Sequence, residues 1–187
     1  MNHRMVSFPA LLVLVSALMG LLIWGIVQSD SKPGGVGVNS DFGEVIVSKQ
    51  VAPALKLLTL DGNMMDLSEL HGRVVMVDFW SSWCAPCLLE AQELADSYRD
   101  YKSKGVEFLG VAIWDQERNV RRYVEKFSLD YPNAVDTTGI APISFGVRGI
   151  PEKYFIDKNG LLIRKFIGPM TSEILGDILD KQLADPS

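Results

Sequence analysis

An apolar run that leads into the chain's only two cysteines, and then into an amphipathic helix, constrains the fold more than any other feature. Residues 74–80 are apolar except at Asp78, as expected for a central strand in a sheet that is covered on both faces. The cysteines, Cys84 and Cys87, follow this strand with two residues between them. Beyond them, apolar side chains recur at helical spacing, at Leu88, Ala91, Leu94, Ala95 and Tyr98. This order indicates an α/β domain with two thiols at the turn from strand to helix.

Further strand and helix patterns predict how the sheet is built. They are, in chain order, a hairpin at 55–60 and 64–65, the strand at 74–80, a helix after Cys84, a strand at 106–114, a helix at 120–127, a hairpin at 153–157 and 161–167, and a closing helix capped by Thr171. The strand–helix–strand unit in the middle requires a right-handed crossover and a parallel pair of strands. Because the last hairpin is antiparallel, we predict a central mixed β-sheet covered by helices on both faces.

The N-terminal part differs in composition from the rest. No charged side chain occurs from Met5 to Ser29, and its densest apolar stretch, residues 8–27, has 20 residues. A membrane-spanning helix needs about 20 apolar residues, and Arg4 ahead of the stretch favours a cytoplasmic N-terminus. We therefore expect residues 1–28 to be an uncleaved signal-anchor. A cleaved secretory signal is the alternative.

The segment after the apolar stretch separates it from the folded part. Residues 29–37 mix glycine, proline and small polar residues, which is typical of a flexible tether. We expect a linker at 29–50 and one domain at 51–187. The predicted location is the inner (cytoplasmic) membrane, with a single pass and the catalytic domain in the periplasm.

The charge balance excludes one class of function. The chain has 18 basic residues against 23 acidic ones, a net charge of −5, and every acidic residue lies at or after Asp30. Nucleic-acid backbones are bound by clustered basic side chains. We therefore expect no nucleic-acid partner.

The position of the cysteine pair at the start of a helix indicates redox chemistry. A thiol at a helix N-terminus faces unpaired N–H groups and the positive end of the helix dipole, and both favour the reactive thiolate. We expect the sulfur of Cys84 to stay exposed and to attack a substrate disulfide. Cys87, one turn further on, would resolve the mixed disulfide and close a Cys84–Cys87 bond.

Other uses of two cysteines fit the sequence less well. A disulfide across so short a loop restrains the unfolded chain little, which disfavours a purely structural bond. A structural zinc site needs four ligands, whereas the only histidines are His3 and His71. We expect no metal and no cofactor. A Cu(I) site on the two thiolates, as in a metallochaperone, stays open as an alternative.

Asp78 is the one charged residue in the apolar strand ahead of the cysteines. A lone buried carboxylate is costly as an anion, so its pKa should be raised. Such a carboxyl group could take or give the proton of Cys87 during exchange. The alternative is an inert carboxylate, hydrogen-bonded at the end of the strand.

Two segments together resemble a known family. Residues 77–87, which end in the sequence Trp-Cys-Ala-Pro-Cys, are similar to the active-site segment of thioredoxin, and residues 149–151 are similar to its cis-proline loop. With the hairpin, an insert before the proline loop and the expected anchor, residues 50–185 resemble the TlpA/ResA/DsbE (CcmG) branch of membrane-anchored thiol–disulfide oxidoreductases. The resemblance implies a thioredoxin-like fold with an N-terminal β-hairpin extension and a central insert.

The resemblance also implies a substrate-binding surface. It places a cis bond between Ile150 and Pro151 beside Cys84, where the backbone of Ile150 would pair with an extended substrate segment. Trp83 and Glu152 would belong to the same surface, although Glu152 could equally be a charge facing solvent. Asp78 occupies the position of the buried aspartate of thioredoxin.

The family's usual task supplies the expected partners. Its members keep cysteines of exported proteins reduced, especially those of apocytochrome c during cytochrome c biogenesis, with electrons from a membrane thiol reductase of the DsbD/CcdA type. Because this chain has no third cysteine, it must exchange disulfides with such a partner in trans. The direction of electron flow follows from the resemblance alone, so an oxidant or isomerase of exported proteins is the alternative. A peroxidase fits this cysteine motif less well.

Overall fold

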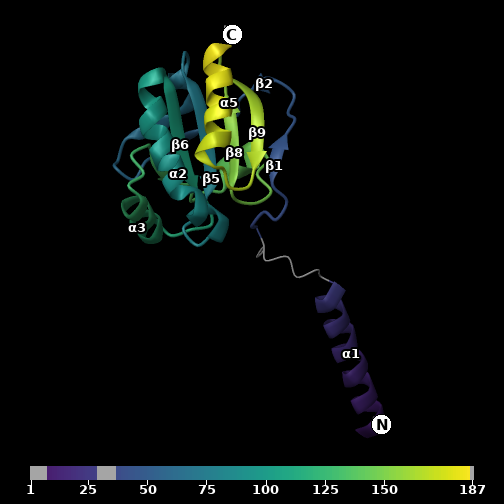
Figure 1. The fold of residues 1–187 in the computed structure, drawn as a ribbon. Helices are drawn as coiled ribbons and strands as arrows, with labels where there is room; N and C mark the ends of the chain where they lie inside the picture. The colour runs from purple at the N-terminus through teal and green to yellow at the C-terminus, as the bar shows by residue number, and fades with distance from the viewer. Residues whose placement is uncertain (1–7, 29–36, 186–187) are drawn as a thin grey trace. The chain divides into compact units, whose positions relative to one another are not determined.

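The structure, a computed structural model, describes residues 8–28 and 37–185, and the chain divides into the units Met1–Gly34 and Gly35–Ser187. The first unit contains helix α1 (Phe8–Gln28) (Figure 1). Among the described residues, no helix combines the length and the apolar character that crossing a membrane requires. The signal-anchor expected at residues 1–28 stays a prediction.

The second unit holds the remaining elements. Its strands are β1 (Gly43–Val45), β2 (Gln50–Val51), β3 (Lys56–Leu58), β4 (Met64–Asp66), β5 (Val74–Trp80), β6 (Val106–Ala112), β7 (Asn133–Val135), β8 (Glu152–Ile156) and β9 (Leu161–Ile167). Its α-helices are α2 (Ala85–Tyr101), α3 (Glu117–Phe127), α4 (Ile140–Phe145) and α5 (Ser172–Ala184), with short 3-10 turns at Leu67–Leu70 and Lys102–Lys104.

The main sheet is mixed, as predicted. Its strands lie in the order β1-β9-β8-β5-β6-β7, and β2 also pairs with β9. Strand β5 lies at the centre and is buried along its whole length. It runs parallel to β6 and antiparallel to β8, so the predicted parallel unit and the predicted final hairpin share one sheet.

Helices cover both faces of this sheet. Phe79 on β5 contacts Phe145 of α4 and Tyr154 of β8, whereas its neighbour Trp80 stacks on Tyr123 of α3. Adjacent residues of a strand point to opposite faces, so α4 and α3 lie on opposite sides of β5. Figure 1 shows α2 and α5 packed side by side on the sheet. The predicted thioredoxin-like arrangement is confirmed.

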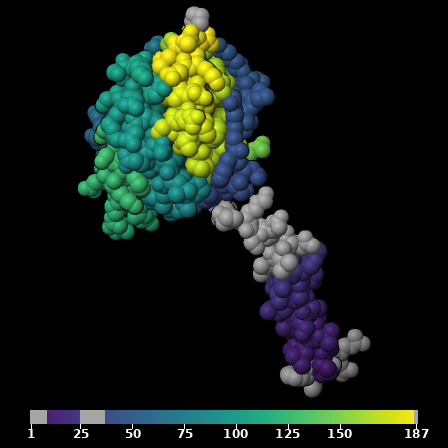
Figure 2. All heavy atoms as spheres, viewed as in Figure 1, coloured from purple at the N-terminus to yellow at the C-terminus, as the bar shows by residue number. Residues whose placement is uncertain are grey.

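The folded unit begins before residue 51, the predicted start of the domain. Strand β1 pairs antiparallel with β9, Gly43 opposite Ile167, and β2 pairs with the other end of β9. Figure 2 shows these early residues, in blue, lying against the yellow-green C-terminal part of the domain. The predicted linker at 29–50 is therefore wrong for the residues of β1 and β2, because their backbone completes the edge of the sheet.

The N-terminal hairpin forms a separate small sheet. Strands β3 and β4 pair antiparallel, with Leu57 opposite Met65. A single bridge between Thr59 and Ala134 connects this hairpin to β7 of the main sheet. The hairpin was predicted from the sequence, whereas β7 and α4 were not.

Candidate active site

The two cysteines form a disulfide at the start of α2. Cys84 is the N-cap residue, with extended backbone angles, and its Sγ accepts a hydrogen bond from the backbone N–H of Cys87 at 3.2 Å. Pro86 lies in the first turn, where it leaves no N–H without a partner. The sequence therefore places the sulfur of Cys84 against the positive end of the helix.

Both cysteines are buried in this disulfide state. The exposed fraction is 0% for Cys84 and 1% for Cys87. The expectation of an exposed Cys84 sulfur is wrong for this state, because the sulfur is bonded to Cys87 and belongs to the main apolar cluster. The free thiolate of the mechanism belongs to the dithiol state, and attack on the disulfide requires a local opening.

The cis-proline loop supplies the second part of the site. The peptide bond between Ile150 and Pro151 is cis. The backbone of Ile150, expected to pair with a substrate, already pairs with the chain itself: its N–H donates to the carbonyl of Gly37, and its carbonyl accepts from the N–H of Asn39, both at 2.8 Å. Its side chain is fully buried.

Trp83 lies on the surface beside the disulfide. Its side chain is about half exposed, and its indole N–H donates to the backbone carbonyl of Trp114 at 3.0 Å. Trp114 is also about half exposed. Both indoles thus leave apolar surface exposed at this end of the domain.

Asp78 lies in the interior of β5, and it is not alone there. It is opposite Lys153 in the antiparallel register of β5 and β8, and both side chains are almost fully buried. Nζ of Lys153 lies 3.5 Å from Oδ1 of Asp78. The alternative of a carboxylate at the strand end is thus excluded, and the expectation of a lone carboxylate is corrected.

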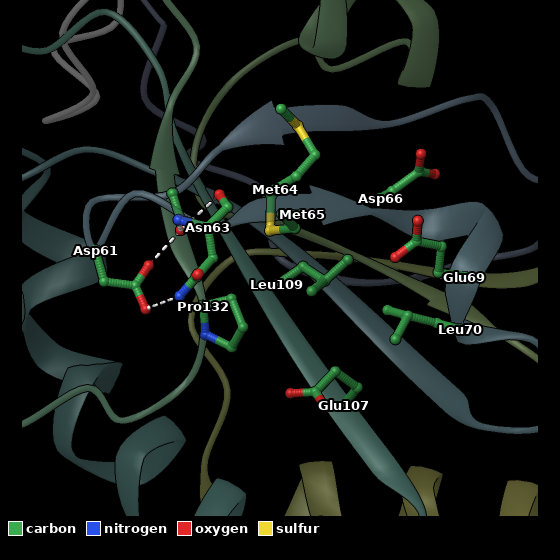
Figure 3. Close-up of a pocket in the computed structure, with 11 residues that line it drawn as sticks. Asp61, Asn63, Met64, Met65, Asp66, Glu69, Leu70, Glu107, Leu109 and Pro132 are labelled. Atoms are coloured by element: carbon green, nitrogen blue, oxygen red, sulfur yellow. Dashed lines mark hydrogen bonds between the residues drawn. The ribbon is translucent and has the colours of Figure 1, made fainter.

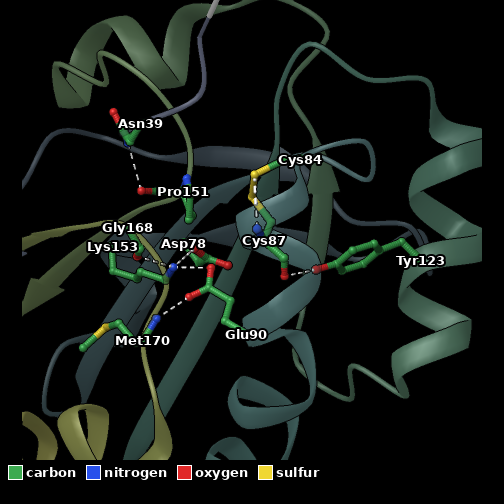
Figure 4. A network of polar contacts seen from close by, with 10 residues as sticks. All are labelled: Asn39, Asp78, Cys84, Cys87, Glu90, Tyr123, Pro151, Lys153, Gly168 and Met170. Carbon is green, nitrogen blue, oxygen red and sulfur yellow. Dashed lines mark hydrogen bonds and ion pairs between the residues drawn. A yellow bond between two sulfur atoms is a disulfide. The ribbon is translucent and has the colours of Figure 1, made fainter. Parts of the chain in front are cut away.

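A second buried carboxylate completes this charged group. Lys153 donates one hydrogen bond to Glu90 of α2 and another to the carbonyl of Gly168 at 3.1 Å. The other carboxylate oxygen of Glu90 accepts from the backbone N–H of Met170 at 2.8 Å. Figure 4 shows the Lys153 ammonium joined to both carboxylates. Glu90 lies one helical turn after Cys87, so the group is built into the cysteine-bearing helix.

The burial of these groups changes their ionisation. Burial raises the pKa of Asp78, and the attraction of Lys153 opposes this rise only in part. Burial also raises the pKa of Glu90, to about 7. Two carboxylates share one ammonium, so near neutral pH the site can hold a proton that a thiol has released.

Tyr123 of α3 contacts the cysteine-bearing turn. Its hydroxyl donates to the backbone carbonyl of Cys87 at 2.6 Å. Burial raises the pKa of Tyr123, and the negative charges of Asp78 and Glu90 raise it further. The phenol therefore stays protonated and holds the first turn of α2 in place.

Glu152, expected on the substrate-binding surface, lies inside the protein. It is 0% exposed and forms an ion pair with Lys165 at 2.7 Å. It also accepts hydrogen bonds from the hydroxyl of Tyr154 and the backbone N–H of Arg148. Both earlier interpretations of Glu152, as a substrate contact or a solvent-facing charge, are therefore wrong in this state.

Glu90 and Lys153 are site residues that the sequence analysis missed. Each had a detectable signal. Glu90 falls on the side of the helix that also carries Ala91 and Leu94, and Lys153 directly precedes the apolar residues 154–156 of the predicted strand. A charged residue on a buried face needs a partner of opposite charge, but their pairing joins residues 63 positions apart.

A hollow at the β3–β4 hairpin is separate from this site. Figure 3 shows it lined by residues of the hairpin and of β6. Three of its carboxylates already have partners: Asp61 accepts a hydrogen bond from Asn63, Asp66 forms an ion pair with Lys56, and Glu107 forms one with Arg73. Because none of the predicted site residues lines it, it has no part in the cysteine chemistry.

Known proteins are related to this chain in sequence. Residues 48–165 match the AhpC/TSA family. The thiol-disulfide oxidoreductase ResA of Bacillus thuringiensis (strain Al Hakam) is 31% identical over 180 residues, which cover 96% of this chain and 97% of the relative. The ResA protein of Geobacillus thermodenitrificans is 29% identical over 172 residues, 92% of each chain.

Solved structures agree with the sequence relatives. A thiol:disulfide interchange protein of the thioredoxin family from Chlorobium tepidum superposes with a TM-score of 0.67 at 26% identity, over 75% of this chain and 100% of that one. A second structure from the same organism, named as a thiol:disulfide interchange protein DsbE, superposes with a TM-score of 0.69 at 27% identity, over 75% of this chain and 100% of that one. The predicted resemblance is thus confirmed, to the ResA proteins in sequence and to the DsbE proteins in fold. The chain therefore belongs to the AhpC/TSA family and is a thioredoxin-like thiol–disulfide oxidoreductase of the ResA type.

Proposed function

We propose that this chain reduces disulfides of exported proteins, such as apocytochrome c during cytochrome c biogenesis, with Cys84 as the nucleophile and Cys87 as the resolving thiol. One observation supports Cys84 as the nucleophile: its Sγ accepts a hydrogen bond from the backbone N–H of Cys87 at the N-terminus of α2. The same N–H and helix end would stabilise a thiolate on Cys84 in the dithiol form.

The exchange proceeds in two balanced steps. The Cys84 thiolate attacks one sulfur of the substrate disulfide, forms a mixed disulfide and releases the other substrate sulfur as a thiolate. Cys87 then loses its proton to the Asp78–Glu90–Lys153 group and attacks Sγ of Cys84. This second step forms the Cys84–Cys87 disulfide and releases the second substrate thiolate, so the substrate gains two electrons.

The oxidised protein must then be reduced by a partner. The chain contains two cysteines, so a dithiol donor of the DsbD/CcdA type would attack the disulfide in trans. The choice of reduction over oxidation rests on family resemblance. A reduction potential of about −120 mV, the value of DsbA, would instead identify an oxidant.

The proposed location is the outer side of the cytoplasmic membrane. The apolar composition of residues 8–27 supports export, and attachment to the membrane is a separate part of the proposal. Extraction of cell membranes with alkaline carbonate tests it: an anchored chain stays with the lipid, whereas release into the supernatant argues for a cleaved signal or a soluble exported protein.

Trapping of the mixed disulfide tests the function directly. We expect the Cys87→Ser chain to accumulate a disulfide-linked complex with its substrate through Cys84, and the Cys84→Ser chain to accumulate none. Mass spectrometry of the complexes from membranes identifies the partner, and an apocytochrome c among them supports the proposed task. Complexes formed only by Cys84→Ser would reverse the two roles. Tight Cu(I) binding by the dithiol with negligible exchange would favour the copper-binding alternative.

A further inference from the structure

We propose that residues 37–39 occupy the substrate-binding edge of the cis-proline loop, where an extended polypeptide would otherwise dock. Such a substrate must displace this segment before it can pair with the loop. The identity of the competitor rests on the proposed function. The intrachain contact itself does not.

The backbone contact uses both hydrogen-bonding groups of Ile150. Its N–H donates to the carbonyl of Gly37 and its carbonyl accepts from the N–H of Asn39, each at 2.8 Å. Val38 and Ile150 form an isolated parallel bridge. This is strand addition of a short segment to an open edge, and it leaves Ile150 no free backbone group for a second segment.

Side-chain contacts select what fits on this edge. A Cβ atom at Gly37 would lie 2.8 Å from the indole of Trp114, and Gly37 has a positive φ of 90°. The side-chain amide of Asn39 donates to the carbonyl of Pro151 at 3.1 Å, as Figure 4 shows. A Cβ at Gly149 would lie 2.5 Å from Oδ1 of Asn39. A segment that binds this edge therefore needs a glycine where it passes over Trp114. Two residues further along the segment, it needs a side chain that can donate a hydrogen bond.

The segment is held weakly enough to be displaced. All three of its residues are partly accessible to solvent, and they precede β1 rather than belonging to a strand of the main sheet. Three hydrogen bonds attach it, and each contributes about 2- to 13-fold to an equilibrium. A substrate that supplies the same backbone pairing can therefore compete with the segment. The contact thus slows the reaction with extended polypeptides, which need this edge, more than the reaction with small disulfides or thiols, which do not.

Kinetics on the full-length oxidised chain test the proposal. The probes are a synthetic extended peptide with one cysteine, and dithiothreitol, which has no backbone to pair. The Asn39→Pro variant removes the N–H to Ile150 and the amide to Pro151. The quantity measured is the rate constant for reduction by the peptide divided by the rate constant for reduction by dithiothreitol. We expect this ratio to be about tenfold higher for Asn39→Pro than for the wild type. An unchanged ratio overturns the proposal.

A matched pair of glycine variants separates the contact from backbone strain. Gly37→Ala and Gly62→Ala both place a Cβ at a positive φ, of 90° and 85°, but only the first meets a neighbour, since nothing lies within 4 Å of the second. The same increase in the peptide-to-dithiothreitol ratio is expected for Gly37→Ala and none for Gly62→Ala. An equal change in both variants contradicts a role for the Trp114 contact.

Binding in trans tests the contact without any redox step. A synthetic peptide of residues 35–42 should bind the Asn39→Pro chain at least about tenfold more tightly than the wild type, in which the edge is occupied. Equal binding to both chains overturns the proposal. If neither peptide thiol nor dithiothreitol reduces any variant, the proposed function fails, while the peptide-binding result still decides whether residues 37–39 occupy the edge.

Discussion

At the scale of single residues, the buried charges behind the disulfide determine where a proton can go during exchange. Lys153 has two carboxylate partners, Asp78 and Glu90, and all three side chains are almost fully buried. Full ionisation would leave one uncompensated negative charge in a poorly solvated site. The group therefore favours a state that holds an extra proton, and it accepts or returns that proton as the thiols change state.

The substitution Asp78→Asn tests this role. We expect disulfide exchange near pH 7 to slow by about 100-fold, the lower end of the usual contribution of general acid–base catalysis. The fold should persist because the amide is nearly isosteric with the carboxyl group. Stopped-flow rates across a pH series measure the effect, with Asp96→Asn, an exposed carboxylate on α2, as the control. An unchanged pH–rate profile would reduce Asp78 to a structural residue.

The raised pKa of Glu90 predicts how stability depends on pH. Burial raises this pKa from 4.5 to about 7, so between these values the folded chain keeps a proton that the unfolded chain has released. Glu90 therefore makes the free energy of unfolding fall as pH rises from about 4.5 to about 7, and its contribution is constant above that range. The raised pKa of Asp78 acts in the same direction.

Urea denaturation at a series of pH values measures this slope. We expect Glu90→Gln to flatten it between pH 5 and about 7, because the titrating group is gone. Glu93→Gln is the matched control on the same helix: hydrogen bonds from Ser172 lower the pKa of Glu93, so its contribution changes only at lower pH. An equal slope in wild type and Glu90→Gln would show that Glu90 titrates normally.

At the scale of elements, the start of α5 is attached to the cysteine-bearing helix. The backbone N–H of Met170 donates to Glu90, and that of Ser172 donates to Glu93 at 2.9 Å. Both acceptors lie on α2. Helix α5 thus helps to fix the side of α2 that carries Glu90.

The N-cap of α5 gives a stability prediction for this junction. The side chain of Thr171 accepts a hydrogen bond from the backbone N–H of Ile174, which confirms the predicted N-cap. Thr171→Ala should lower the free energy of unfolding by about 1 kcal/mol, whereas Thr171→Ser, which keeps the acceptor, should cost less. Chemical denaturation compares the two variants. Equal losses would mean that the cap contributes nothing and that only side-chain packing matters.

Periodic elements were predictable from the sequence, and short ones were not. The helical spacing located α2, α3 and α5 correctly, yet Leu88 and Ile174, assigned to the buried faces, are 38% and 41% exposed. Both lie near the N-terminal ends of their helices. Strand β7 has three residues and α4 has six, with Pro142 inside it. Neither is long enough to show a period.

At the scale of the whole molecule, the sequence predicted those parts of the site that depend on neighbouring residues. Cys84, Cys87 and Asp78 lie within one strand, turn and helix, so their arrangement follows from local structure. The pairing of Lys153 with Glu90 joins β8 to α2. The docking of Asn39 on Pro151 spans 112 positions. Such contacts depend on how distant elements meet, and one sequence alone carries no pattern for them.

The central claim is that Cys84 becomes the reactive thiolate when the disulfide is reduced. Its pKa in the reduced full-length chain tests this most directly, from the pH dependence of alkylation by iodoacetamide with Cys84 identified by mass spectrometry. We predict a pKa below about 8.5, the value of a free cysteine, because the N-terminus of α2 favours the thiolate. A pKa at or above about 8.5 would contradict the claim.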